Sequence, residues 1–407
     1  RTKQTDILKF LLVGFSLRAL LVILDQYFIS LPGGNLDAKS YESYAFYISN
    51  NYGLSILFNM FTNEDVALVP RIISVFYSLT SRSEMMAQGI SVALGTSSIY
   101  LVYRLTLIIW DKNAAIKASW IMALHPSMIL FSALVLREAY VTFFLLLTLI
   151  LSVIFIQKLF NLNTNSMKIN YIFNKENLIY FIFIFFGFYF LKNLHGAIFV
   201  GYFVFLIFIF YYFLKDEFSD LKKGKLKIKL ILIISLIFPP FIMWYFEILM
   251  IPYIPGPERL LDLQDILLRR FMIGSISLVN GPLGSNYPAW TIPSDTIDFI
   301  PKIFLRIIYF LYSPFPWDIK RYDHLMGLAD SILMIYISIC FWRNRKLIWK
   351  NPLTRFLLIL LLTYFILYGL GTSNFGTSIR HKTKFIFIFV CLAAPKLLNL
   401  MTSKKKV

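Results

Sequence analysis

The chain has 407 residues, of which 58% are hydrophobic, 18% aromatic and only 15% charged, with a mean hydropathy of +0.68. Soluble domains carry about 25% charged residues, so this composition excludes a water-soluble globular protein, and the two cysteines exclude a disulfide scaffold. The formal net charge of +18 would suggest a nucleic-acid partner in a soluble protein, whereas in a membrane protein it can arise from basic cytoplasmic loops.

Long apolar segments recur along the chain, and a helix crosses the hydrocarbon layer with about 20 such residues. The ten expected spans cover residues 7–28, 86–110, 114–136, 138–158, 177–192, 194–214, 230–250, 324–342, 355–371 and 384–400. Each should be a helix, because lipid offers the backbone no hydrogen-bond partner outside the segment. The sequence therefore predicts an all-α transmembrane bundle over residues 1–400, followed by a basic tail at 401–407.

Lysine and arginine clusters flank these spans, and ten spans place every cluster on one side of the membrane. The clusters fall at residues 1–9, 112–117, 158–175, 215–229, 343–355 and 404–406. The positive-inside rule makes that side cytoplasmic, so both termini are expected in the cytoplasm. The excess positive charge is then a consequence of topology, and we predict no nucleic-acid partner.

Two large segments, residues 29–85 and 251–323, are left on the outer side. Within them, residues 66–80 and 302–316 are apolar but short, and counting 302–316 as a span would turn the basic cluster at 343–355 outward. We therefore expect both to be interfacial helices. Long loops on one face of a helical bundle often carry the functional residues.

The first candidate, Asp37, follows the first span, with Tyr41 one turn later on the same face. An Asp in this position can simply cap a helix, and the sequence supports that interpretation about equally well. The functional alternative is a carboxylate that deprotonates or orients an acceptor hydroxyl or amine.

The second candidate is Glu138, which follows Arg137 at the start of the fourth span. Pro126 should kink or break the third span just before it. His125 is expected to be a packed, hydrogen-bonded residue, and no metal site is proposed because no carboxylate lies near it in sequence. Arg137 and Glu138 could also do no more than cap two helix ends.

The third candidate is a short outer loop in which cations collect against the positive-inside bias. Arg380 and Lys384 should share one face, which favours a clamp for phosphate or pyrophosphate. We expect these bases to stand apart from Asp37. The expected binding residues are Tyr41, Arg71, Arg137, Lys192, His195, Asn374, Arg380, His381 and Lys384.

In these motifs the chain resembles the C-type glycosyltransferase superfamily, polytopic enzymes that use polyprenyl-phosphate-linked sugars, including protein mannosyltransferases and the aminoarabinose transferase. The resemblance rests on Asp37-x-x-x-Tyr41, on Leu-His-Pro126 with Arg137-Glu138, and on Asn374-x-Gly376-Thr377-x-x-Arg380-His381. It covers most of residues 1–200 and about 370–395. The first loop has Asp37-Ala38 where many members have an acidic pair.

The resemblance implies a transferase that moves a sugar from a polyprenyl-phosphate carrier to a lipid, glycan or protein acceptor. Its site would lie on the periplasmic or extracellular face of a bacterial inner membrane. Asp37 and Glu138 would be the catalytic carboxylates. No cofactor is predicted, and a role for a divalent metal stays open. The alternatives are a polysaccharide polymerase or ligase, and a transporter or flippase for a lipid-linked solute.

Overall fold

The computed structural model describes residues 2–61, 68–161, 166–167, 175–220, 286–291, 296–319 and 323–398. The expected span at 230–250, most of the outer segment 251–323 and the tail at 401–407 lie outside the described residues. Within them the protein is helical, apart from a short antiparallel pair of strands, β1 (Phe160–Asn161) and β2 (Ser166–Met167).

The first part of the chain alternates long helices with short ones. These elements are α1 (Thr2–Tyr27), η1 (Gly34–Ala38), α2 (Lys39–Tyr52), η2 (Gly53–Asn59), α3 (Leu68–Leu79), α4 (Glu84–Ile109), α5 (Lys112–Leu124), α6 (Pro126–Ala133) and α7 (Arg137–Leu159). The rest forms α8 (Lys175–Leu194), η4 (Gly196–Phe199), α9 (Val200–Asp220), η7 (Ala289–Thr291), α12 (Thr296–Tyr312), η8 (Pro316–Asp318), α13 (Asp323–Lys350), α14 (Pro352–Gly371), α15 (Phe375–Thr383), α16 (Ile386–Ala393) and η9 (Ala394–Lys396).

Six described helices are long and apolar enough to cross a membrane, namely α1, α4, α7, α8, α13 and α14. A seventh span arises if α5 and α6 are counted as one segment bent by 58°, which confirms the predicted break at Pro126. These helices fit an integral membrane protein. In the region of the last expected span, 384–400, the chain turns at Lys384–Phe385 and continues as a shorter apolar helix, Ile386–Lys396.

The break between α5 and α6 is stabilised by a buried arginine from α1. The Arg18 side chain is fully buried and donates to the carbonyls of Met122 and Ala123, at 3.4 and 3.5 Å, and to Ser132 Oγ at 2.8 Å. The last carbonyls of a helix have no partner within that helix. Arg18 therefore hydrogen-bonds groups that the break exposes, and it ties α1 to both halves of the bent segment.

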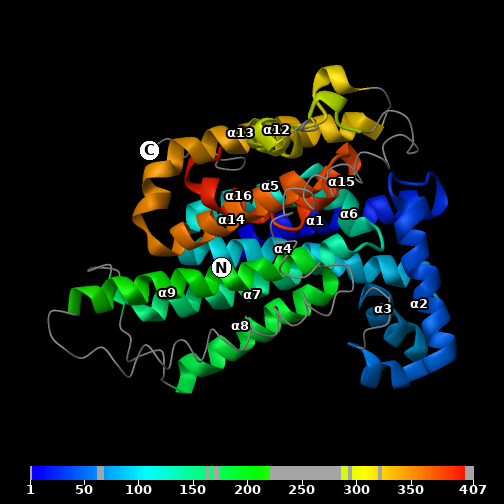
Figure 1. Ribbon diagram of the computed structural model, residues 1–407. Helices are drawn as coiled ribbons and strands as arrows, with labels where there is room; N and C mark the ends of the chain where they lie inside the picture. Colours follow the sequence, from blue (N-terminus) through cyan, green and yellow to red (C-terminus); the bar gives the residue numbers. More distant parts are fainter. Residues whose placement is uncertain are drawn as a thin grey trace.

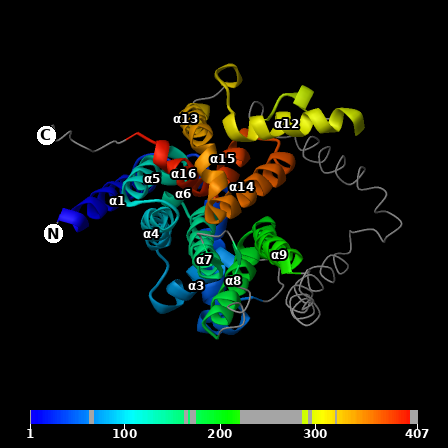
Figure 2. The ribbon, with the colours of Figure 1, turned by 90° about the vertical axis from the view of Figure 1, so that its left-hand side faces the viewer.

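The long helices run along one direction, and shorter ones cross it at one end of the bundle. In Figure 1 α2 crosses that end, and the two views together show α12 lying across the bundle (Figures 1 and 2). The start of α4 meets the end of α1 there, where Gln88 donates to Asp25 at 2.7 Å. The start of α7 meets the end of α8, where the ring centroids of Phe144 and Phe190 lie 4.5 Å apart. Lys112, Lys158, Lys175 and Lys350 fall at the opposite end, as the grouping of basic clusters predicts.

Candidate functional site

Four charged side chains from distant parts of the chain meet at the end of the bundle crossed by α2. Arg380 of α15 forms an ion pair with Asp37 Oδ2 through Nη1, and its Nε donates to Glu138 Oε1 at 3.2 Å. Lys384 Nζ lies 3.6 Å from the same Glu138 oxygen. The expectation that the bases at 380–384 stand apart from Asp37 is therefore wrong: helix packing brings them together across 343 positions of sequence.

Local structure explains how the two carboxylates are presented. Asp37 lies in η1, a π-helical turn, and the next helix, α2, has Ala38 as its N-cap with no side-chain cap hydrogen bond. Asp37 thus does not cap α2, and its side chain stays 55% exposed. Glu138 lies in the first turn of α7 and is 1% exposed, where the positive end of the helix dipole stabilises a carboxylate.

Two histidines and two tyrosines surround these charges. Tyr368 of α14 hydrogen-bonds His195 Nδ1 at 2.9 Å, and the ring centroids of His195 and His381 lie 5.5 Å apart. Burial, and then the cation of Lys384, lower the pKa of both histidines, so both are neutral at pH 7. Burial raises the pKa of Tyr41, and the nearby charges of Arg137, Glu138, Arg380 and Asp37 also influence this pKa. The expected residues Tyr41, His195 and His381 therefore lie together with the four charged side chains.

The two cations that contact Glu138 differ in how firmly they hold their protons. Although burial acts to lower it, the carboxylates of Glu138 and Asp37 raise the pKa of Arg380 above its usual value. Burial lowers the pKa of Lys384 to about 7, since Arg137 and Arg380 oppose the attraction of Glu138. Arg380 is thus a permanent cation, whereas Lys384 changes charge near neutral pH.

The charges of the site are not balanced. Among the described residues, three cations, Arg137, Arg380 and a protonated Lys384, lie with the two carboxylates of Asp37 and Glu138. Within the described part of the chain, Lys384 Nζ and Glu138 Oε2 are buried without a hydrogen-bond partner. Buried polar groups are normally satisfied, so the arrangement favours a ligand that brings negative charge and hydrogen-bonding oxygens.

A cavity of about 250 Å³ adjoins Arg380. Its walls come from the segment before η1, from α6 and from the start of α13, and α15 provides the side that carries Arg380. The lining residues are Pro32, Gly33, Leu130, Phe131, Pro314, His324, Met326, Asn374, Phe375, Gly376, Thr377, Ile379 and Arg380. A mostly apolar cavity with one fixed cation suits an amphipathic anion.

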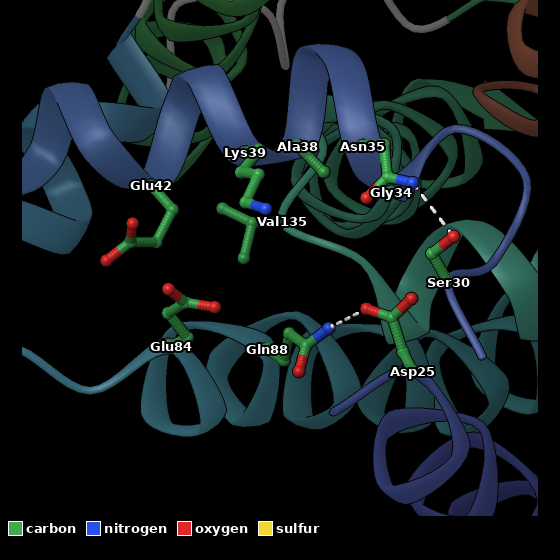
Figure 3. Close-up of a pocket in the computed structure, with 10 residues that line it drawn as sticks. All are labelled: Asp25, Ser30, Gly34, Asn35, Ala38, Lys39, Glu42, Glu84, Gln88 and Val135. Carbon is green, nitrogen blue, oxygen red and sulfur yellow. Dashed lines mark hydrogen bonds between the residues drawn. The ribbon is translucent and has the colours of Figure 1, made fainter. Parts of the chain in front are cut away.

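A second, smaller pocket of about 100 Å³ adjoins η1 and is lined by Gly34 and Ala38 of that turn. Glu42 and Glu84 lie opposite each other at one end and Asp25 at the other (Figure 3). Glu42 already pairs with Arg82 at 2.7 Å, and Gln88 donates to Asp25 at 2.7 Å. Nowhere in the described ranges do three or more His, Cys, Asp or Glu side chains gather in a way that could hold a metal ion.

Two expected binding residues, Arg71 and Lys192, have other surroundings, and a third, Asn374, has a capping role. Arg71 is buried in α3 and donates to the Met60 carbonyl at 3.0 Å. Lys192 lies over the rings of Tyr189 and Phe199. Asn374 is the N-cap of α15 and accepts from the Thr377 N–H at 3.2 Å; it lines the cavity but is explained by its capping role.

The sequence interpretation missed Asp330, a fully buried acid in α13. Its Oδ1 lies 3.1 Å from His125 Nδ1 and its Oδ2 lies 3.4 Å from Lys382 Nζ, with each side chain 1% exposed. The expectation that His125 is packed and hydrogen-bonded is confirmed, and its carboxylate partner comes from α13, more than 200 positions away. An acid within the apolar run 324–342 was the available signal.

The fold and the site together define a helical protein that fits a membrane and has a positively charged, partly buried site at one end of its bundle. Comparison with models of known protein families and with curated protein sequences finds no match for this chain.

Proposed function

We propose that the protein is a membrane glycosyltransferase that moves a sugar from a polyprenyl-phosphate carrier to a lipid, glycan or protein acceptor. The observation that carries the proposal is the meeting of Asp37, Glu138, Arg380 and Lys384 at one end of an apolar helical bundle. A carrier with an isoprenoid tail must stay in lipid while its phosphate reaches such a site. The site end would then face the periplasm or the extracellular space, with the basic clusters and both termini in the cytoplasm.

The proposed chemistry uses one displacement at the anomeric carbon. An acceptor hydroxyl oxygen attacks this carbon while its bond to the phosphate oxygen breaks, and the acceptor proton passes to Asp37 as the general base. The polyprenyl phosphate leaves with the bonding electron pair, and the anomeric configuration is inverted. Arg380 and Lys384 stabilise the charge that develops on the leaving phosphate, and Glu138 holds both cations in place.

The substitution Asp37→Asn tests this role directly. It keeps the shape of the side chain and a hydrogen-bond acceptor for Arg380 but removes the base, so transfer from a polyprenyl-phosphate sugar should fall by about 10²-fold or more. The matched control is Glu84→Gln, an exposed acid at the same end of the bundle that pairs with Arg82 at 3.8 Å rather than with Arg380. Full activity of the folded Asp37→Asn variant would rule out Asp37 as the base.

A transporter or flippase for a lipid-linked anion is a second candidate, favoured by the break between α5 and α6 and by the buried ionisable side chains of His125, Asp330 and Lys382. Broken helices and buried ionisable groups are typical of transporters. Reconstitution in vesicles with a labelled polyprenyl-phosphate sugar separates the two functions: transfer to an added acceptor supports the enzyme, and transbilayer movement without transfer supports the transporter.

A further inference from the structure

A cluster of buried ionisable side chains lies behind the candidate site and has no part in the proposed chemistry. It consists of Asp330 on α13, Lys382 on α15 and His125 at the junction of α5 and α6, each 1% exposed. Ser127 also contacts His125, with its Oγ 3.1 Å from Nδ1. A nucleophile relay is excluded, because the serine and the aspartate approach the same imidazole nitrogen, whereas a relay needs one on each.

One member of this cluster, Lys382, lies on the same short helix, α15, as Arg380. Successive residues of an α-helix are rotated by about 100°, so Arg380 and Lys382, two positions apart, point to opposite faces of α15. Arg380 reaches Asp37 and Glu138 on one side. On the other side Lys382 reaches Asp330 and donates to the Leu311 carbonyl of α12 at 3.1 Å.

We propose that Asp330 is a positioning residue: by holding Lys382 on the back of α15, it fixes the rotation of this short helix so that Arg380 faces Asp37 and Glu138. α15 has only nine residues, and helices of that length have little stability of their own in isolation, so contacts on both faces must set its orientation. His125 contacts the other oxygen of Asp330 and thereby connects the break between α5 and α6 to the Asp330–Lys382 pair, which we call the anchor.

The anchor also fixes one wall of the 250 Å³ cavity. Thr377, Ile379 and Arg380 of α15 line it, together with residues of α6 and α13. These are the elements that the cluster of Asp330, Lys382 and His125 joins. A rotation of α15 would therefore reshape the cavity as well as move Arg380. The catalytic consequence rests on the proposed function, but the position of Arg380 can be tested without any substrate.

The test replaces the buried ion pair by apolar side chains of similar size, in the double variant Asp330→Leu/Lys382→Met. Such replacements often leave stability unchanged, whereas loss of one partner alone leaves a buried charge unpaired. The matched control is Lys158→Met/Glu176→Leu, which removes an ion pair of 3.2 Å between α7 and α8 at the opposite end of the bundle. His125 keeps its contact with Ser127 in both variants.

The measurement is the rate at which phenylglyoxal modifies Arg380 in the detergent-solubilised full chain, read by mass spectrometry. Arg82, which pairs with Glu42, is the internal reference. We expect the double variant to remain folded and Arg380 to react about tenfold faster, because it loses charge-assisted hydrogen bonds to two carboxylates. The control variant should react at the wild-type rate.

A folded double variant with wild-type reactivity at Arg380 would overturn the inference, since a purely structural pair leaves Arg380 in place. If the double variant is not recovered folded, Asp330→Asn/Lys382→Met replaces it, because the amide keeps the shape of the carboxylate and no buried charge is left unpaired. A rate several-fold above wild type then supports the anchor, and an unchanged rate overturns it. A failure of the proposed function is distinguishable from this: phenylglyoxal would still modify Arg380 faster in the variant, but the wild-type protein would transfer no sugar.

Discussion

Replacing Lys384 by methionine should make the protein more stable at neutral pH while removing its activity. The Lys384 side chain is fully buried, its Nζ has no hydrogen-bond partner in the described structure, and burial lowers its pKa from 10.5 to about 7. Methionine fills similar space without a charge. The lysine is retained at a cost in stability, as is common for groups that serve a functional site.

The size of the gain follows from proton linkage. The folded protein holds the Lys384 proton less tightly than the unfolded chain does, so between pH 7 and about 10.5 the unfolded chain binds more protons and the free energy of unfolding rises with pH. Each tenfold change in proton affinity is worth about 1.4 kcal/mol. The linkage thus destabilises the wild type by about 4 kcal/mol at pH 7, and Lys384→Met should recover about 2–4 kcal/mol of this.

The assay is unfolding of the detergent-solubilised protein at pH 7, 8 and 9, with wild type and variant side by side. The advantage of Lys384→Met should be largest at pH 7 and shrink by about 1 kcal/mol per pH unit up to pH 9. The control Lys158→Met changes an exposed lysine that pairs with Glu176, and it should alter stability by less than about 1 kcal/mol at every pH. A variant that is less stable than wild type at pH 7, or an advantage that does not change with pH, would refute the reasoning.

Two further predictions concern packing and capping. Gly95→Ala should destabilise the protein by about 1–3 kcal/mol, because an added Cβ would lie 2.4 Å from Ser132 Cβ. Gly89→Ala in the same helix has open space around it and should stabilise the protein by about 0.5–1 kcal/mol. Thermal unfolding in which both variants shift the stability in the same direction would contradict this packing. Asn374→Ala should lower the free energy of unfolding by about 1 kcal/mol through loss of the α15 cap, whereas Asn374→Ser keeps a cap and should keep transfer activity. Loss of activity in Asn374→Ser would indicate that Asn374 binds substrate in addition to capping α15.

The membrane character and most helix positions could be predicted from the sequence, because each depends on local properties. Apolar runs form helices wherever lipid leaves the backbone no other partner, and the long helices α4, α7 and α14 follow their predicted spans closely. The break at Pro126 was equally predictable, since proline removes a backbone donor. The turn at Lys384–Phe385 was not: near it, Thr142 of α7 donates to the Thr383 carbonyl at 3.0 Å, a contact that depends on packing.

The sequence by itself determined that Asp37, Glu138, Arg380 and Lys384 are unusual charges at helix ends, because charged groups are costly in apolar surroundings. Only the tertiary structure decided which of them meet. Whether Arg380 stands apart from Asp37 or pairs with it depends on how helices distant in sequence pack, and the same holds for Asp330 with His125 and Lys382. The cost of burying a charge can be judged from its neighbours in sequence, but which residue pairs with it depends on how the helices pack.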